Sequence, residues 1–294
     1  MMSNFEQELT TQPEMWRRAT ELASTVTLLP PPGARVAFVG CGTSLYVAQA
    51  AAAYRNEQML GESDAFPASE MPPGRLYDEV VMISRSGTTT EVLEATAVIA
   101  PRTRTLAITA VDDSPLARLV TDRIVLSFAD ERSVVQTRFA TSTLSLLLTH
   151  CGWDVEASAT RAEVFLSEPP PEEVDAADHF VFLGRGVAAA LANEAALKFR
   201  EILGAWTESY PTMEYRHGPI SAASERSLVW ILDNAEPSID EEIAATGARV
   251  VRSGGDPLAG LVRVHRAAQY LAARRDIDPD HPRFLTRSIM LERQ

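Results

Sequence analysis

Val36-Ala-Phe-Val-Gly40-Cys-Gly42-Thr-Ser44 decides the fold, because this stretch joins an apolar strand to a helical pattern over residues 45–60 through a G-x-G turn. Phe180-Val-Phe-Leu-Gly184-Arg-Gly186 repeats the arrangement and leads into a second helical pattern over residues 187–203. Glycines before a helix expose backbone N–H groups at the positive end of the helix dipole, which suits a phosphate. The repeat predicts two copies of one α/β unit.

The rest of the chain continues this alternation. Further strands are expected at residues 78–84, 105–109, 123–128, 228–232 and 248–252, and further helices at residues 5–27, 88–100, 115–120, 139–151 and 239–246. Residues 258–274 suggest a strand followed by a helix. Such alternation is typical of doubly wound parallel sheets with helices on both faces.

The proline-rich segment 168–173 is the expected linker, because a proline triplet favours an extended, semi-rigid chain. The sequence therefore predicts two domains, residues 1–167 and residues 174–294. The tail after Asp276 is expected to pack over another part of the protein.

Composition excludes several classes of protein. The net charge of −13 opposes general binding to nucleic acid. No apolar segment is long enough to span a membrane, and the acidic N-terminus does not resemble a signal peptide, so we expect a cytoplasmic protein. Cys41 and Cys151 alone form neither a metal cluster nor a disulfide framework.

Ser84-Arg85-Ser86-Gly-Thr-Thr89-Thr90 follows an expected strand and opens an expected helix. Its hydroxyls and backbone N–H groups suit a phosphate monoester, and Ser44 would lie at the same edge of the sheet. A Ser/Thr-rich helix cap is the alternative interpretation. Leu45 stands where the dinucleotide fingerprint has its third glycine, and no P-loop is present, so neither NAD, ATP nor another cofactor is expected.

Two further segments carry candidate catalytic residues. Glu194, Lys198 and Glu201 share one helix face, either as a surface ladder of ion pairs or with Glu201 as a general base. His217 precedes Gly218-Pro219 in an expected loop, which makes it a catalytic candidate. No second histidine lies near it, so no metal site is expected.

Taken together, these segments resemble the sugar isomerase (SIS) domain family, which acts on phosphosugars. The resemblance extends over nearly the whole chain as two tandem, flavodoxin-like SIS units. It is strongest to the isomerase half of the glucosamine-6-phosphate synthases and to the amino-sugar-phosphate deaminases and isomerases. The segments that carry it are residues 41–44, 84–89, 131–139, 194–201, 217–219 and 278–288.

The resemblance implies a role for each candidate residue. Glu201 would move a proton between C1 and C2 of an open-chain sugar, beside Lys198, and His217 would assist ring opening, commonly from the partner subunit of a homodimer whose site lies at the interface. The residues expected to bind the phosphate are Ser44, Ser84, Ser86 and Thr89, with Arg85 as an added cation, and those expected to border the sugar are Thr43, Val134 and Val135.

Two departures from the synthases bear on the reaction. We expect no glutamine-hydrolysing half in this protein, and therefore no glutamine-dependent amino transfer. Arg287 stands where the synthases have a lysine that assists ring opening and forms an imine. Because arginine stays protonated, it is a poor nucleophile, although it can still anchor an anion or a hydroxyl.

The sequence therefore predicts an aldose–ketose isomerase or deaminase that acts on a hexosamine 6-phosphate by removing the C2 proton. One alternative is a lyase or dehydratase that eliminates the C3 oxygen of an N-acetylhexosamine 6-phosphate. The other is a non-catalytic sensor of sugar phosphates, although residues 1–33 are too short and too acidic for the DNA-binding domain of such regulators.

Overall fold

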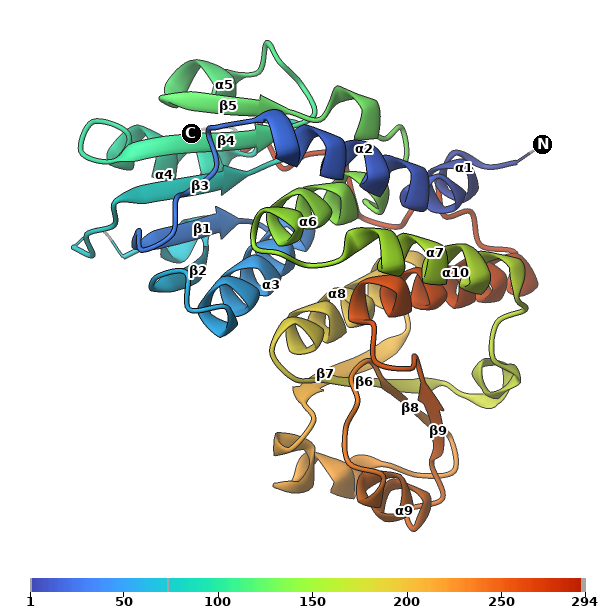
Figure 1. Cartoon of the computed structure of the whole chain (residues 1–294). Coiled ribbons are helices and arrows are strands. Elements are labelled where there is room, and N and C mark those ends of the chain that lie inside the picture. The colour runs from blue at the N-terminus through green and yellow to red at the C-terminus, as the bar shows by residue number, and fades with distance from the viewer. Residues whose placement is uncertain (1, 73, 292–294) are drawn as a thin grey trace. The chain divides into compact units, whose positions relative to one another are not determined.

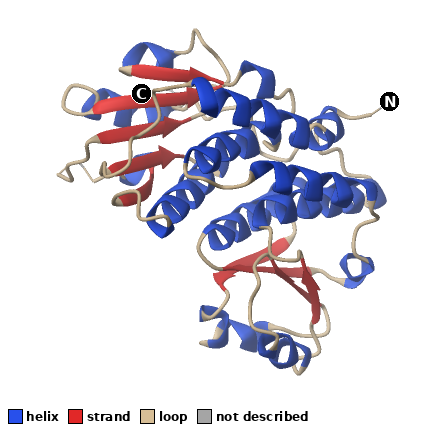
Figure 2. Cartoon of the chain, viewed as in Figure 1, coloured by secondary structure: helices blue, strands red, loops and turns tan. Residues whose placement is uncertain are grey.

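The computed structural model describes residues 2–72 and 74–291, and it shows an α/β protein with two parallel sheets (Figures 1 and 2). The expected fold class, two tandem doubly wound units, is confirmed. Within the described residues, no helix has the length and apolar character needed to cross a bilayer.

The first sheet holds five parallel strands in the order β2-β1-β3-β4-β5, which is the flavodoxin-like order. Helix α3 packs against β1 and beside α6, while Val92 of α4 and Leu116 of α5 pack against inward-facing residues of the sheet. The bounds are β1 Val36–Gly40, α3 Thr43–Glu57, β2 Ser63–Pro67, β3 Glu79–Ile83, α4 Thr90–Ile99, β4 Arg104–Thr109, α5 Pro115–Leu119, β5 Asp122–Val125 and α6 Arg138–His150.

The second sheet has the order β7-β6-β8-β9, which repeats the first arrangement with one strand fewer. Helices α8 and α10 lie side by side on this unit, and α9 packs through Ile239 and Ile243 against Val181 and Leu183 of β6 (Figure 1). The bounds are β6 His179–Gly184, α8 Val187–Leu203, β7 Trp206–Pro211, β8 Ser227–Ile231, α9 Ser238–Ala244, β9 Arg249–Arg252 and α10 Pro257–Arg274.

The two G-x-G turns have nearly the same geometry. Gly42 has φ 54° and ψ −125°, and Gly186 has φ 56° and ψ −123°, a region that favours glycine. A Cβ on Gly40 would lie 2.7 Å from the backbone of Ser44, and one on Gly184 would lie 2.2 Å from the backbone of Ala188. Each turn therefore needs glycine at both positions, as expected for two copies of one unit.

The compact units differ from the expected division of the chain at its ends and at its internal boundary, which lies between Glu156 and Ala157 and not in the proline-rich segment 168–173. Of the described residues, those within 14–156 and 286–291 form one unit, and those within 2–13 and 157–285 form the other. The N-terminal segment is fixed to the second unit by the backbone N–H groups of Asn4 and Phe5, which donate to the Asp280 carboxylate at 2.8 Å. The C-terminal tail belongs to the first unit, which the alternation of strands and helices did not indicate.

Several elements also differ from expectation. The single helix expected at residues 5–27 is two helices, α1 (Asn4–Thr10) and α2 (Gln12–Thr25). Residues 258–274 contain no strand, because Asp256 caps α10 by accepting from Ala259 N at 3.0 Å and Pro257 begins the helix. The elements that were not expected are β2, β7, α7 (Val155–Ser167) and five 3-10 turns, η1 Ala68–Glu70, η2 Ser127–Ala129, η3 Glu172–Ala176, η4 Glu214–Arg216 and η5 Pro219–Ala222.

Candidate functional site

Residues 84–90, called the hydroxyl loop below, follow β3 and lead into α4. Strand β3 pairs with β1, so the loop and the first turn of α3, which carries Thr43 and Ser44, begin at neighbouring strand ends. Ligands of open α/β sheets bind beyond these carboxyl ends. The structure therefore places the expected phosphate-binding residues of the first unit at one edge of its sheet.

Hydrogen bonds within the hydroxyl loop fix its side chains. Ser84 Oγ accepts from Gly87 N at 3.2 Å and lies 3.5 Å from Thr89 Oγ1. Ser86 Oγ accepts from Thr88 N at 3.2 Å and from Thr88 Oγ1 at 2.9 Å. Together with the N-terminus of α4, these groups form a polar, donor-rich edge that suits an anion.

Arg85 is a buried residue of the hydroxyl loop, and its guanidinium contacts segments outside the loop. Nη1 donates to Ser133 O at 2.9 Å, and Nη2 donates to Val134 O at 3.5 Å and to Arg287 O at 3.2 Å. Its guanidinium also lies 3.8 Å from the Glu131 carboxylate. These contacts indicate that Arg85 holds the neighbouring segments in place, whereas the resemblance implied that it binds the phosphate.

The segment around Val134 and Val135 is held by the Glu131 carboxylate, which is fully buried. It accepts from Thr137 N at 2.6 Å, from Thr137 Oγ1 at 2.8 Å and from Arg138 N at 2.8 Å, and so caps α6. Val135 is buried and Val134 is half-buried. The second valine is thus part of the core, and only the first has its side chain partly accessible.

Arg287 forms an ion pair in which one guanidinium nitrogen contacts both carboxylate oxygens of Asp130. Nη2 lies 2.6 Å and 2.9 Å from the two carboxylate oxygens of Asp130, and Nη1 donates to Glu131 O. A guanidinium held in this way is committed to a protein partner. The structure therefore favours an anchoring role for Arg287 over the ring-opening role of the family lysine.

In the second unit, Glu194, Lys198 and Glu201 of α8 form a carboxylate–lysine cluster. Lys198 Nζ lies 3.3 Å from Glu194 Oε1 and forms an ion pair with Glu201 as well. The Lys198 and Glu194 side chains are 0% and 2% exposed, and that of Glu201 is 19% exposed. The surface-ladder interpretation is therefore wrong, because these charges are largely removed from water.

Electrostatics keep Lys198 charged within this cluster. Burial lowers the pKa of the Lys198 ammonium, but the carboxylates of Glu194 and Glu201 raise it by more, so that the net shift is upward. On α10, burial and then the charge of Lys198 lower the pKa of His265 to about 3. Gln12 Nε2 lies 3.4 Å from His265 Nδ1. The cluster thus pairs a fixed cation with a neutral imidazole nearby.

His217 lies on the surface of the second unit, between η4 and η5. Its backbone N–H donates to Glu214 O at 3.0 Å, and Gly218 follows with φ 131°, which disfavours other residues. The turn therefore presents an exposed imidazole, which does not join the buried carboxylate–lysine cluster.

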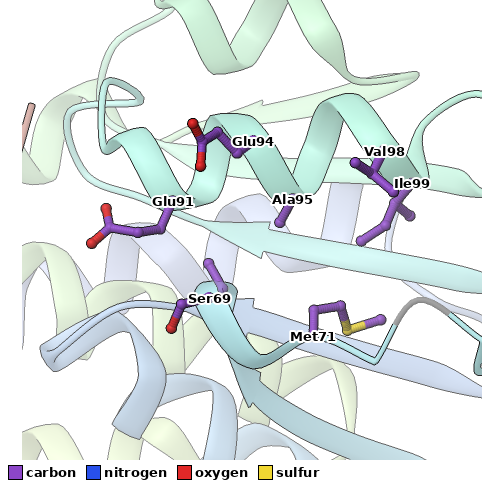
Figure 3. A pocket seen from close by; sticks show the side chains of 8 residues that line it. Ser69, Met71, Glu91, Glu94, Ala95, Val98 and Ile99 are labelled. Carbon is purple, nitrogen blue, oxygen red and sulfur yellow. The ribbon is translucent and has the colours of Figure 1, made fainter. Parts of the chain in front are cut away.

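A separate pocket lies between η1 and α4 (Figure 3). Its walls are mostly apolar, with two carboxylates of α4 among them, and it is lined by Ala68, Ser69, Met71, Glu91, Glu94, Ala95, Val98 and Ile99. None of the expected site residues lines it. Among the described residues of the connection from β2 to β3, the short turn η1 lies where doubly wound folds often place a helix, which is consistent with the hollow beside α4.

The roles of three residues near the expected site residues could not be predicted from the sequence. Glu194 was part of the observed spacing, but its burial beside Lys198 could not be read from that spacing alone. Asp130, which pairs with Arg287, and His265, which lies among the buried residues of α10, showed no signal in the sequence. Contacts between segments far apart in the chain reveal Asp130 and His265, and the burial of α8 reveals Glu194.

Comparisons with known proteins agree with this architecture. Residues 174–249 match the family model of the SIS domain. Glutamine–fructose-6-phosphate aminotransferase (isomerizing) of Methanothermobacter thermautotrophicus is 28% identical over 307 residues, which cover 88% of this chain and 52% of that protein. The chain thus spans about half the length of the curated relatives it matches.

Solved structures extend the similarity over the whole chain. Glucosamine-6-phosphate deaminase of Thermotoga maritima is 27% identical with a TM-score of 0.83, covering 98% of this chain and 100% of that one. The C-terminal domain of glucosamine-fructose-6-phosphate aminotransferase from Francisella tularensis shares the fold, with 19% identity, a TM-score of 0.81 and coverage of 96% and 99%. Residues 174–249 thus match the SIS domain, and the chain as a whole is similar to the isomerase half of glutamine–fructose-6-phosphate aminotransferase and to phosphosugar deaminases and isomerases of that fold.

Proposed function

We propose that this protein is an isomerase or deaminase of a hexosamine 6-phosphate, and that Glu201 transfers the proton from C2 of the open-chain sugar. The observation that carries the proposal is the buried carboxylate–lysine cluster. A carboxylate 19% exposed, held against a charged lysine that is fully buried, is oriented and remains partly accessible to a ligand.

The hydroxyl loop supports the proposed substrate class. Ser84, Ser86 and Thr89, at the N-terminus of α4, offer hydroxyls and helix N–H groups to a phosphate. Ser44 begins α3 at the neighbouring strand end. Similarity to the deaminase and aminotransferase named above is consistent with a 6-phosphosugar as ligand.

Each step of the deaminase reaction follows from one proton transfer. Removal of the C2 proton by Glu201, next to the C1 aldehyde, leaves an enolamine when C2 carries a free amine. Return of the proton to C1 gives an imine at C2, which water hydrolyses to the ketose and ammonia. A substrate with a hydroxyl at C2 would pass through an enediol and give aldose–ketose isomerisation.

Elimination is the second candidate, and the arginine at position 287 leaves it open. Its guanidinium is paired with Asp130 and provides no amine for an imine with a ketose. An N-acetylhexosamine 6-phosphate cannot release ammonia after loss of the C2 proton, so expulsion of the C3 oxygen becomes the productive outcome.

A panel of 6-phosphosugars, with and without an N-acetyl group, distinguishes these candidates. Proton NMR in D₂O is expected to show exchange at C2 for at least one of them. Ammonia release then identifies deamination, conversion without ammonia identifies isomerisation, and loss of the C3 oxygen identifies elimination. Binding of these sugars without any change at C1 to C3 would contradict the enzymatic proposal and favour a sensor.

We further propose a homodimer in which His217 acts on the substrate bound by its partner. The exposure of this imidazole supports the proposal, because the side chain is available to a second copy. Equal amounts of Glu201→Gln and His217→Ala proteins, unfolded and refolded together, are expected to regain about a quarter of wild-type activity. Half of the dimers would then be mixed, and each mixed dimer would have one intact site out of two.

The two variants refolded separately serve as the controls and are expected to stay inactive. A mixture that regains no activity, although it forms mixed dimers, would contradict the proposed role of His217 across the interface.

A further inference from the structure

The C-terminal tail of the first unit lies along the hydroxyl loop. Ser288 Oγ lies 2.8 Å from Thr88 Oγ1, which itself donates to Ser86 Oγ at 2.9 Å. Thr90 N donates to Ile289 O at 3.1 Å, and Leu291 N donates to Thr90 Oγ1 at 2.9 Å. The tail thus contacts the expected phosphate-binding loop through side-chain and backbone groups.

Arg85, Arg287 and Asp130 hold this tail in place, and these three residues are called the tail clasp below. Nη2 of Arg287 lies 2.6 Å from Oδ1 and 2.9 Å from Oδ2 of Asp130. Arg85, whose side chain is 1% exposed, donates to Arg287 O at 3.2 Å and to Ser133 O at 2.9 Å. The side chain of one arginine therefore binds the backbone of the other.

Asp130 lies in a segment that is fixed to the start of α6 by hydrogen bonds. Asp130 O accepts from Arg138 Nε at 3.1 Å, and the neighbouring Glu131 carboxylate caps α6. Arg85 Nη1 lies 3.8 Å from that carboxylate, so the buried guanidinium is held between α6 and the tail. Charge-assisted hydrogen bonds of this kind are stronger and more directional than neutral ones.

We propose that Asp130 and Arg85 are positioning residues that hold residues 287–291 against the hydroxyl loop and thereby fix the hydroxyls of Ser86 and Thr88 for a phosphate. The inference rests on the proposed function for the identity of the ligand. It assigns to Arg287 a purely anchoring role, since Nη2 of its guanidinium is paired with Asp130 and Nη1 donates to Glu131 O. A lysine at this position would keep the charge, but it has no second nitrogen that could donate to Glu131 O while the first pairs with Asp130.

Asp130→Asn tests the clasp, and Asp113→Asn is the matched control. Asp113 pairs with Arg118 at 2.6 Å on the same unit, and Asp113→Asn removes the same charge as Asp130→Asn. Both residues of this control pair are exposed and distant in sequence from the tail. Hydrogen–deuterium exchange of the free protein is expected to be about three- to tenfold faster at residues 286–291 in Asp130→Asn, and unchanged in Asp113→Asn.

Binding of inorganic phosphate and of fructose 6-phosphate, measured by calorimetry, provides the second readout. Asp130→Asn is expected to weaken both by about three- to tenfold, and Arg287→Gln by a similar factor, because each removes the same ion pair. Their double variant is expected to bind no more weakly than either single one. Arg287→Lys should fall between wild type and Arg287→Gln.

Three results would overturn the inference. Unchanged exchange of the tail in both Asp130→Asn and Arg287→Gln would show that the clasp does not hold it. Unchanged or tighter phosphate binding with a loosened tail would show that the tail does not support the loop. Additive losses in the double variant would mean that the two residues act separately. All readouts are free of turnover, so a protein without activity on any hexosamine phosphate would contradict the proposed function alone.

Discussion

Glu201→Gln is expected to lower kcat by about 10²- to 10⁴-fold, the range that a positioned general base contributes. Glutamine has the shape of the carboxylate but cannot accept the C2 proton. Lys198 keeps Glu194 as a partner at 3.3 Å, so the charge of the lysine remains compensated in the variant. Initial rates with the best substrate of the panel, together with calorimetric binding of fructose 6-phosphate, measure the effect.

Two variants serve as controls for Glu201→Gln. Glu241→Gln, at an exposed position of α9, removes the same charge from the same unit and is expected to leave the rate unchanged. Glu201→Asp keeps the carboxylate but shortens its reach, and it is expected to retain part of the activity. A Glu201→Gln protein that binds normally and works within a factor of about three of wild type would rule out this residue as the base.

Lys198→Met is expected to destabilise the protein by about 3–5 kcal/mol, the range for breaking a buried ion pair from one side. The variant leaves Glu194, whose side chain is 2% exposed, with its negative charge but without the neighbouring ammonium. The cost arises mainly from the loss of the ammonium beside this buried carboxylate. Urea unfolding followed by circular dichroism measures the free energy of unfolding.

A second substitution tests the cause of that loss. Glu194→Gln combined with Lys198→Met removes both buried charges, so we expect the double variant to recover much of the stability lost by Lys198→Met alone. Equal or greater loss in the double variant would indicate that packing of the lysine side chain, and not the charge of Glu194, explains the effect.

The fold could be predicted because two glycine turns carry most of the information. Gly40 and Gly184 have no room for a side chain, and Gly42 and Gly186 share one unusual backbone conformation. The geometry of the turn therefore requires glycine at these positions, and the repeat is visible in the sequence for that reason. Strands β2 and β7 escaped prediction because Ser-Asp-Ala-Phe-Pro and Trp-Thr-Glu-Ser-Tyr-Pro lack the apolar runs of central strands; both lie at sheet edges.

The candidate site could be predicted only in part. The spacing of Lys198 and Glu201 identified one face of α8, since residues three apart on a helix are neighbours. Whether that face is buried depends on packing against α10, which spacing does not contain. Arg85 looked like a phosphate ligand because of its place in the hydroxyl loop, but its contacts with Ser133 and Arg287 come from segments about 50 and 200 residues away.

Loss of deuterium from glucosamine 6-phosphate labelled at C2 tests the central claim most directly, because deamination, isomerisation and elimination all begin with this step. Wild-type protein is expected to move the label to C1 or to water, as followed by NMR. Glu201→Gln protein, at concentrations where fructose 6-phosphate still binds, is expected to leave the label at C2. Release of the label by Glu201→Gln at the wild-type rate would contradict the account.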